Sequence, residues 1–85
     1  MREEINLKIK HIAANIRKVR EKRNYTQEYL ALKLGISQNA YSKIELGYTK
    51  ITIERLFHIA HILNADVTEL IGLPKIDSFA LRASS

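Results

Sequence analysis

The chain has 85 residues, a formal net charge of +5 and no cysteine. This length allows one domain with a small core, and the lack of cysteine excludes disulfides and thiolate metal sites, so packing must supply the stability. No apolar run approaches the roughly 20 residues of a membrane span, and the first ten residues lack the apolar stretch of a signal peptide, so we expect a cytoplasmic protein without membrane contact.

The first predicted helix combines an apolar stripe with the excess positive charge. Alternating spacings of four and three residues predict a helix over residues 5–22. Its stripe consists of Ile5, Ile9, Ile12, Ile16 and Val19. Residues 1–24 contain eight Lys or Arg against three Glu, whereas residues 25–85 contain six of each sign. A basic segment of this kind favours a polyanionic partner such as nucleic acid.

Two short helices separated by a glycine are predicted next. Thr26 is the expected N-cap of the second helix, which Gly35 ends because glycine readily adopts a positive φ. Ser37 is the expected N-cap of the third helix, which runs from Gln38 to about Leu46 before Gly47. The apolar contacts of this pair are assigned to Leu30, Ala31, Leu34, Ile36, Tyr41 and Ile44. This arrangement is typical of a helix-turn-helix.

Two further helices complete the prediction. Thr52 is the expected N-cap of a fourth helix. One sector of that helix contains Ile53, Leu56, Phe57, Ala60 and Leu63, and we expect it to face the core. Asp66 and Glu69 have the spacing of a capping box, which predicts a short fifth helix as far as Ile71.

The predicted fold class is all-α, a compact bundle of five helices joined by short turns. No stretch alternates apolar and polar residues between turn signals, so no strand is expected. We assign residues 1–73 to the helical domain. Residues 74–85 form a C-terminal tail without a helical stripe, which we expect to be either frayed or docked on a partner.

The outward face of the third helix is polar in a way that suits DNA. Asn39, Ser42 and Lys43 lie opposite the apolar side, and Gln38 projects from the first turn. Glutamine and asparagine can form paired hydrogen bonds with adenine, lysine can reach guanine or phosphate, and an α-helix fits the major groove. The alternative is an ordinary solvated face. The spacing around Gly35 favours DNA over that alternative.

The sequence resembles the Cro and phage-repressor type of helix-turn-helix regulators, often called the xenobiotic-response-element family. The resemblance covers residues 12–71, including "TQEYLALKLGIS" and "QNAYSKIELG". The positions that match the family's pattern are Gln27, Ala31, Gly35, Ile36, Ile44 and Glu45. The resemblance implies a lambda-repressor-like five-helix domain, with the helix-turn-helix at helices two and three, and sequence-specific binding of double-stranded DNA.

Residue roles follow from the same resemblance. It implies base reading by four residues of the third helix: Gln38, Asn39, Ser42 and Lys43. Gln27 corresponds to the family's phosphate-anchoring glutamine, supported by the positive end of a helix dipole. We expect Tyr48 and Lys50, from the following loop, to bind phosphate as well. Arg20 and Glu45 correspond to a pair that bridges the first helix to the recognition helix without touching DNA.

The chain departs from the family pattern at two places. Leu46 stands where asparagine or arginine is common, and Lys50 is the only cation of the segment "LGYTKI". Tyr41 replaces a branched aliphatic residue, and we expect its ring to reach past the core toward the DNA backbone.

The sequence gives little support for metal binding or enzyme activity. His58 and His61 have a spacing that can bind metal, but no third ligand is evident and we expect them at the surface. No nucleophile elbow or phosphate-binding glycine loop is present, so we predict no enzyme activity, no cofactor and no small-molecule ligand. Solubilising charge is one interpretation of Arg17, Lys18, Lys22, Arg23 and Lys33; the alternative is that together they form a positive field and that a few of them contact phosphates. Packing, rather than base stacking, is the interpretation of Tyr25, Tyr29 and Tyr48.

Two functional hypotheses remain. The first is a transcriptional regulator, most simply a repressor, that binds a palindromic operator as a homodimer with half-sites about 34 Å apart. Candidates for the dimer surface are Ile62, Val67, Leu70, Leu73, Ile76 and Phe79. The alternative is an antitoxin-like module whose first task is to bind a protein, with DNA binding secondary. Deleting residues 74–85 would discriminate between the two.

Overall fold

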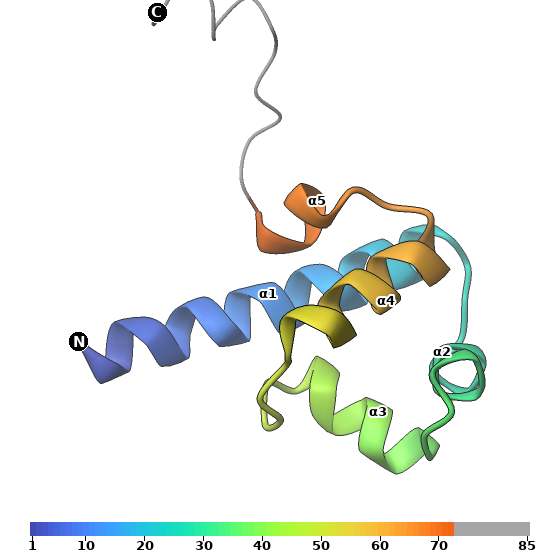
Figure 1. Ribbon diagram of the computed structural model, residues 1–85, viewed down its shortest axis with the longest axis horizontal. Helices are drawn as coiled ribbons and strands as arrows, with labels where there is room; N and C mark the ends of the chain where they lie inside the picture. Colours follow the sequence, from blue (N-terminus) through green and yellow to red (C-terminus); the bar gives the residue numbers. More distant parts are fainter. Residues whose placement is uncertain (73–85) are drawn as a thin grey trace, which may run out of the picture.

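The computed structural model describes residues 1–72, which form five α-helices and no strand (Figure 1). The helices are α1 (Arg2–Lys22), α2 (Gln27–Leu34), α3 (Gln38–Glu45), α4 (Ile53–Leu63) and α5 (Val67–Ile71). The long α1 crosses the whole molecule, with α2 and α3 on one side of it and α5 on the other. The all-α prediction is therefore confirmed.

The helix boundaries follow the predicted caps. The hydroxyls of Thr26, Ser37 and Thr52 each accept a hydrogen bond at 3.0 Å from the backbone N–H three residues ahead. Asp66 and Glu69 form the reciprocal capping box at the start of α5. These bonds satisfy N–H groups that a helix start leaves without an intrahelical partner, which is why short helices such as α2 and α3 have defined starts.

The turn between α2 and α3 depends on a left-handed backbone. Gly35 has φ +73°, and no neighbouring atom lies within 4 Å of the place where a Cβ would be. The conformation, rather than crowding, therefore favours glycine at this position. Asn24, with φ 61°, makes the corresponding turn after α1.

One core joins all five helices. Its buried members are Ile16, Leu30, Ala31, Leu34, Tyr41, Ile44, Ile59, Ala60, Leu63 and Leu70. The predicted inward positions of α2 and α3 are confirmed, and they pack against α1 and α4. This core holds the two helices of the helix-turn-helix at a fixed angle to each other.

Two parts of the predicted apolar faces are wrong. Ile53 and Phe57 are 75% and 57% exposed as whole residues, because α4 turns the side bearing Ile59 to the core and leaves these two at its edge. The first helix begins at Arg2 rather than residue 5, and Ile5 is exposed because the first turns of α1 extend beyond the bundle (Figure 1).

Polar side chains tie the ends of α4 and α5 to α1. Arg23 donates from Nε to the carbonyl of Leu63 at 2.9 Å and from Nη2 to that of Asn64 at 3.1 Å, at the C-terminus of α4. Asn15 Nδ2 donates to the carbonyl of Leu70 at 3.1 Å. Arg23 therefore has a structural role, which its interpretation as solubilising charge did not predict. Within residues 1–72, no helix has the length and apolar character needed to cross a membrane.

Candidate nucleic-acid interface

The α3 helix divides into a buried side and an open side. Tyr41, Ile44 and Glu45 are buried. On the other side, Gln38, Asn39 and Lys43 are exposed and Ser42 is partly exposed. The structure therefore brings the four predicted base-reading residues to one solvent-facing surface. These four residues offer amide, hydroxyl and ammonium groups, which can form hydrogen bonds with base edges in the major groove.

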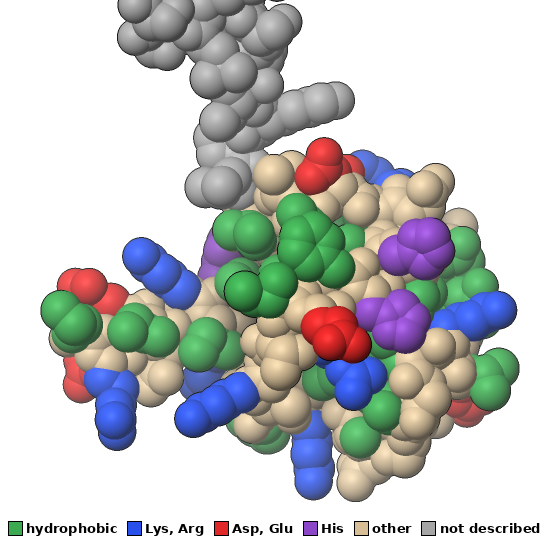
Figure 2. All heavy atoms as spheres, viewed as in Figure 1, with side chains coloured by type: hydrophobic (Ala, Val, Ile, Leu, Met, Phe, Trp, Pro, Cys, Tyr) green, Lys and Arg blue, Asp and Glu red, His purple; other side chains and the backbone are tan. Residues whose placement is uncertain are grey.

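Basic side chains lie on the same side of the molecule as α3. Figure 2 shows Lys and Arg side chains projecting from the N-terminal half of α1 and from the lower edge of the molecule, where α3 lies. Tyr48 and Lys50, in the connection after α3, are both exposed. The amide N–H of Tyr48 donates to the carbonyl of Lys43 at 3.0 Å, so the connection folds back on the last turn of α3. Lys50 lines one depression together with Asn39 and Lys43 of α3, so this predicted phosphate-binding residue lies beside the outer face of α3.

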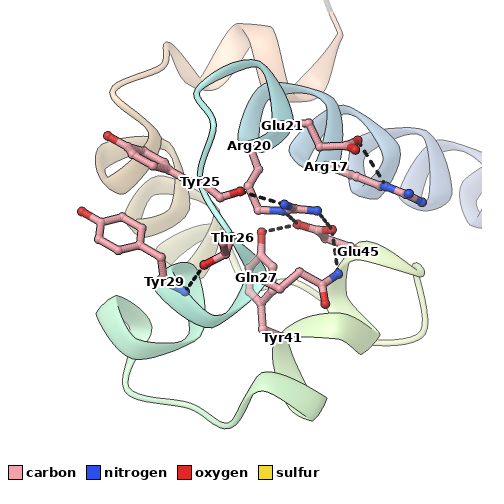
Figure 3. Close-up of polar contacts among 9 residues, drawn as sticks. All are labelled: Arg17, Arg20, Glu21, Tyr25, Thr26, Gln27, Tyr29, Tyr41 and Glu45. Carbon is pink, nitrogen blue, oxygen red and sulfur yellow. Dashed lines mark hydrogen bonds and ion pairs between the residues drawn. The ribbon is translucent and has the colours of Figure 1, made fainter.

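A buried ion pair fixes the orientation of α3. Arg20 of α1 donates from Nε to Oε2 of Glu45 at 2.6 Å and from Nη2 to Oε1 at 3.1 Å (Figure 3). Their side chains are only 11% and 2% exposed. Arg20 also donates from Nη1 to the carbonyl of Tyr25 at 2.8 Å, in the segment leading to α2. A single guanidinium thus links α1, the segment before α2 and α3.

The Glu45 carboxylate accepts two more hydrogen bonds. The hydroxyl of Tyr41 donates to Oε2 at 2.5 Å, and Nε2 of Gln27 donates to Oε1 at 3.1 Å. Sequence reasoning missed both contacts. The spacing of four residues between Tyr41 and Glu45 on one helix is a signal that could have indicated the first.

The environment of Glu45 decides its charge. Burial by itself would raise the pKa of this carboxyl, but the hydrogen bonds from Arg20, Tyr41 and Gln27 outweigh it, so the pKa is lowered and the group is ionised. Burial, followed by the hydrogen bond to Glu45, raises the pKa of the Tyr41 phenol, which stays protonated as a donor. The hydrogen bond to Glu45 raises the pKa of Arg20 despite its desolvation.

The Tyr41 ring does not extend past the core, contrary to the expectation from the sequence. Its side chain is fully buried in the core cluster. The larger ring is accommodated because its hydroxyl reaches the Glu45 carboxylate inside the molecule, which satisfies the one polar atom of the side chain. The tyrosine therefore reinforces the ion pair from within.

Gln27 lies at the first position of α2 and is partly exposed. Its amide nitrogen bears two N–H groups, of which the Glu45 contact uses one. The nearby rings of Tyr25 and Tyr29 pack against each other with centroids 4.7 Å apart, and Lys33 Nζ lies 5.6 Å from the centre of the Tyr29 ring. Tyr25 and Tyr29 are therefore packing residues, as predicted, whereas Tyr48 is 73% exposed, contrary to that prediction.

The candidate dimer residues fall into three groups. Leu70 is fully buried in its own chain's core, so it has no surface to offer a second copy, contrary to expectation. Ile62 and Val67 are partly buried against the same core. Three candidates lie outside the described residues: Leu73, Ile76 and Phe79.

No group of three or more potential metal ligands occurs within residues 1–72. His58 and His61 are both exposed on α4, as expected.

Comparison with known proteins identifies the fold of this interface. The sequence profile of the helix-turn-helix family matches residues 16–70, from the middle of α1 to the core residue of α5. The chain belongs to the helix-turn-helix family. This is a family of DNA-binding transcriptional regulators, and the match includes every residue of α2, α3 and α4.

Two curated relatives from Bacillus subtilis (strain 168) are similar to this helix-turn-helix chain. The HTH-type transcriptional regulator AnsR is 33% identical over 57 residues, which cover 67% of this chain and 49% of AnsR. The uncharacterized HTH-type transcriptional regulator YqaE is 35% identical over 57 residues, with the same coverage of 67% and 49%. The chain thus spans about half the length of these relatives. No solved structure matches it.

Proposed function

We propose that this chain is a transcriptional regulator that binds double-stranded DNA in a sequence-specific manner, with α3 in the major groove. The observation that carries the proposal is the contrast between the two sides of α3. Its inner side is locked to α1 by a buried ion pair, while its outer side presents exposed amide and ammonium groups. A rigid helix with a hydrogen-bonding outer face can read base edges without first being ordered.

Different residues have different tasks in this proposal. Bases are read by Gln38, Asn39, Ser42 and Lys43. The second N–H of the Gln27 amide, together with the backbone N–H groups at the start of α2, binds a phosphate, because a helix N-terminus favours anions. Tyr48 and Lys50 bind the backbone next to α3. The Arg20–Glu45 pair acts on DNA binding indirectly, through the position of α3 and, because Gln27 donates to Glu45, through the position of the Gln27 amide.

The regulator acts as a homodimer on a palindromic operator. A single module of this size makes a modest interface with DNA, and two-fold symmetry doubles the contacts. The exposed apolar side chains of α4, Ile53 and Phe57, and the partly buried Ile62 and Val67 are available to a second copy. Repression is the simplest outcome, because a dimer bound across a promoter excludes the polymerase.

Selection from random DNA duplexes tests this function directly. We expect enriched sequences that contain two inverted half-sites with centres about 34 Å apart, which is one helical turn. Asn39→Ala, which removes a base-reading amide, should change the enriched sequence while leaving the spacing of half-sites unaltered. Failure to enrich any sequence, with a correctly folded chain, would contradict sequence-specific binding. Enrichment of a single half-site would contradict the homodimer but not sequence-specific binding.

A further inference from the structure

The connection between α3 and α4 rests directly on α1 at Lys10. A Cβ at Gly47 would lie 3.0 Å from Cγ of Lys10 and 3.4 Å from its Cα, and Gly47 has φ +78°. A residue with a side chain would therefore both strain the backbone and push against Lys10. The close approach places a cation of α1 beside a loop that contains Lys50 as its only cation.

These two lysines line the same open depression. Its walls include Asn6 and Lys10 from α1 and Tyr48, Thr49 and Lys50 from the connection. No acidic side chain lines it, and neither lysine forms an ion pair within residues 1–72. The depression therefore presents two uncompensated positive charges together with amide and hydroxyl donors, a chemistry that suits phosphate oxygens.

The depression also adjoins the outer face of α3. The amide N–H of Tyr48 bonds to the carbonyl of Lys43, so the connection is held against the end of the recognition helix. Thr49 and Lys50 line both this depression and a second one that includes Asn39 and Lys43 of α3, so the two depressions adjoin.

We infer that Lys10 of α1 completes a backbone clamp with Lys50, the two ammonium groups neutralising neighbouring phosphates of one DNA strand. This inference rests on the proposed DNA binding and adds α1 to the DNA-contacting surface. The extended α1 supplies a second cation beside Lys50, the only cation of the connection. Lys8 offers a matched control: it lies two residues away on α1, on a different face, where it lines an apolar depression with Leu7, His11, Ile12 and Ile71.

The test compares Lys10→Met, Lys50→Met and Lys8→Met for binding to a labelled duplex of random sequence at several salt concentrations. Methionine keeps an apolar stem against Gly47 and removes the charge, and thermal melts establish that each variant is folded. Each lost phosphate contact lowers the slope of log Kd against log salt by about 0.9. We expect a loss of this size for Lys10→Met and for Lys50→Met, about twice as much for the double variant, and a much smaller change for Lys8→Met.

Lys10→Arg should retain the slope, because the charge is kept. All single methionine variants lose one unit of charge, so a purely long-range effect would lower binding equally in Lys10→Met and Lys8→Met, and that result would overturn the clamp. The two proposals fail differently. If the wild-type chain binds no duplex at any salt concentration, the proposed function is wrong. If wild-type binding depends on salt but Lys10→Met has the same slope of log Kd against log salt, only the clamp is wrong.

Discussion

Replacing Arg20 with methionine should strongly destabilise the fold. The substitution leaves the Glu45 carboxylate, 2% exposed, without its charged partner and with two of its four hydrogen bonds. Breaking a buried ion pair from one side costs about 3–5 kcal/mol, and the remaining bonds from Tyr41 and Gln27 place the cost near the lower end, about 3 kcal/mol. For a domain of this size that corresponds to a fall in Tm of roughly 12–24 °C.

Chemical denaturation of four proteins provides the assay: wild type, Arg20→Met, Glu45→Met and the double variant. Because an apolar pair avoids the stranded charge, the double variant should be more stable than the sum of the two single losses predicts. The reasoning is refuted if Arg20→Met costs less than about 1 kcal/mol, or if the two single losses simply add in the double variant.

The remaining predictions concern acid stability and the α3 cap. The pKa of Glu45 is lower in the folded chain than its ordinary value of 4.5, so its stabilising contribution is present above that pH and is lost as the pH falls through the folded pKa. A denaturation series should therefore show wild type losing stability in acid more steeply than Glu45→Gln, and parallel profiles would contradict the assignment. Ser37→Ala removes the hydroxyl that accepts the N–H of Ala40 and should cost about 1 kcal/mol in the free energy of unfolding. Ser37→Asp, which can replace that acceptor, should restore most of the loss, and a failure to do so would argue against capping as the cause.

Sequence patterns predicted the helices and their caps because these depend on local chemistry. A hydroxyl before an apolar helical pattern binds N–H groups three residues away, so Thr26, Ser37 and Thr52 could be identified without knowledge of the fold. Gly35 and Asn24 likewise indicate turns through their own backbone preferences.

Side-chain contacts between helices could not be predicted in the same way. A helical wheel gives an apolar sector but not where the neighbouring helix ends, so Ile53 and Phe57 were placed in the core although they lie at its edge. The departure of Tyr41 from the family pattern suggests a ring that extends past the core, whereas the fold provides an internal partner for its hydroxyl in Glu45. The depression shared by Lys10 and Lys50 depends on the close approach of α1 and the connection, which no spacing in the sequence reveals.

The most direct test of base reading by α3 is to compare cognate and random duplexes for Asn39→Ala and Gln27→Ala, once selection has supplied the cognate sequence. Asn39→Ala should lose about 1–3 kcal/mol of binding free energy on the cognate duplex and almost none on random DNA. Gln27→Ala, which removes a phosphate contact, should weaken both duplexes alike. If Asn39→Ala also weakens cognate and random binding equally, the outer face of α3 does not read the bases.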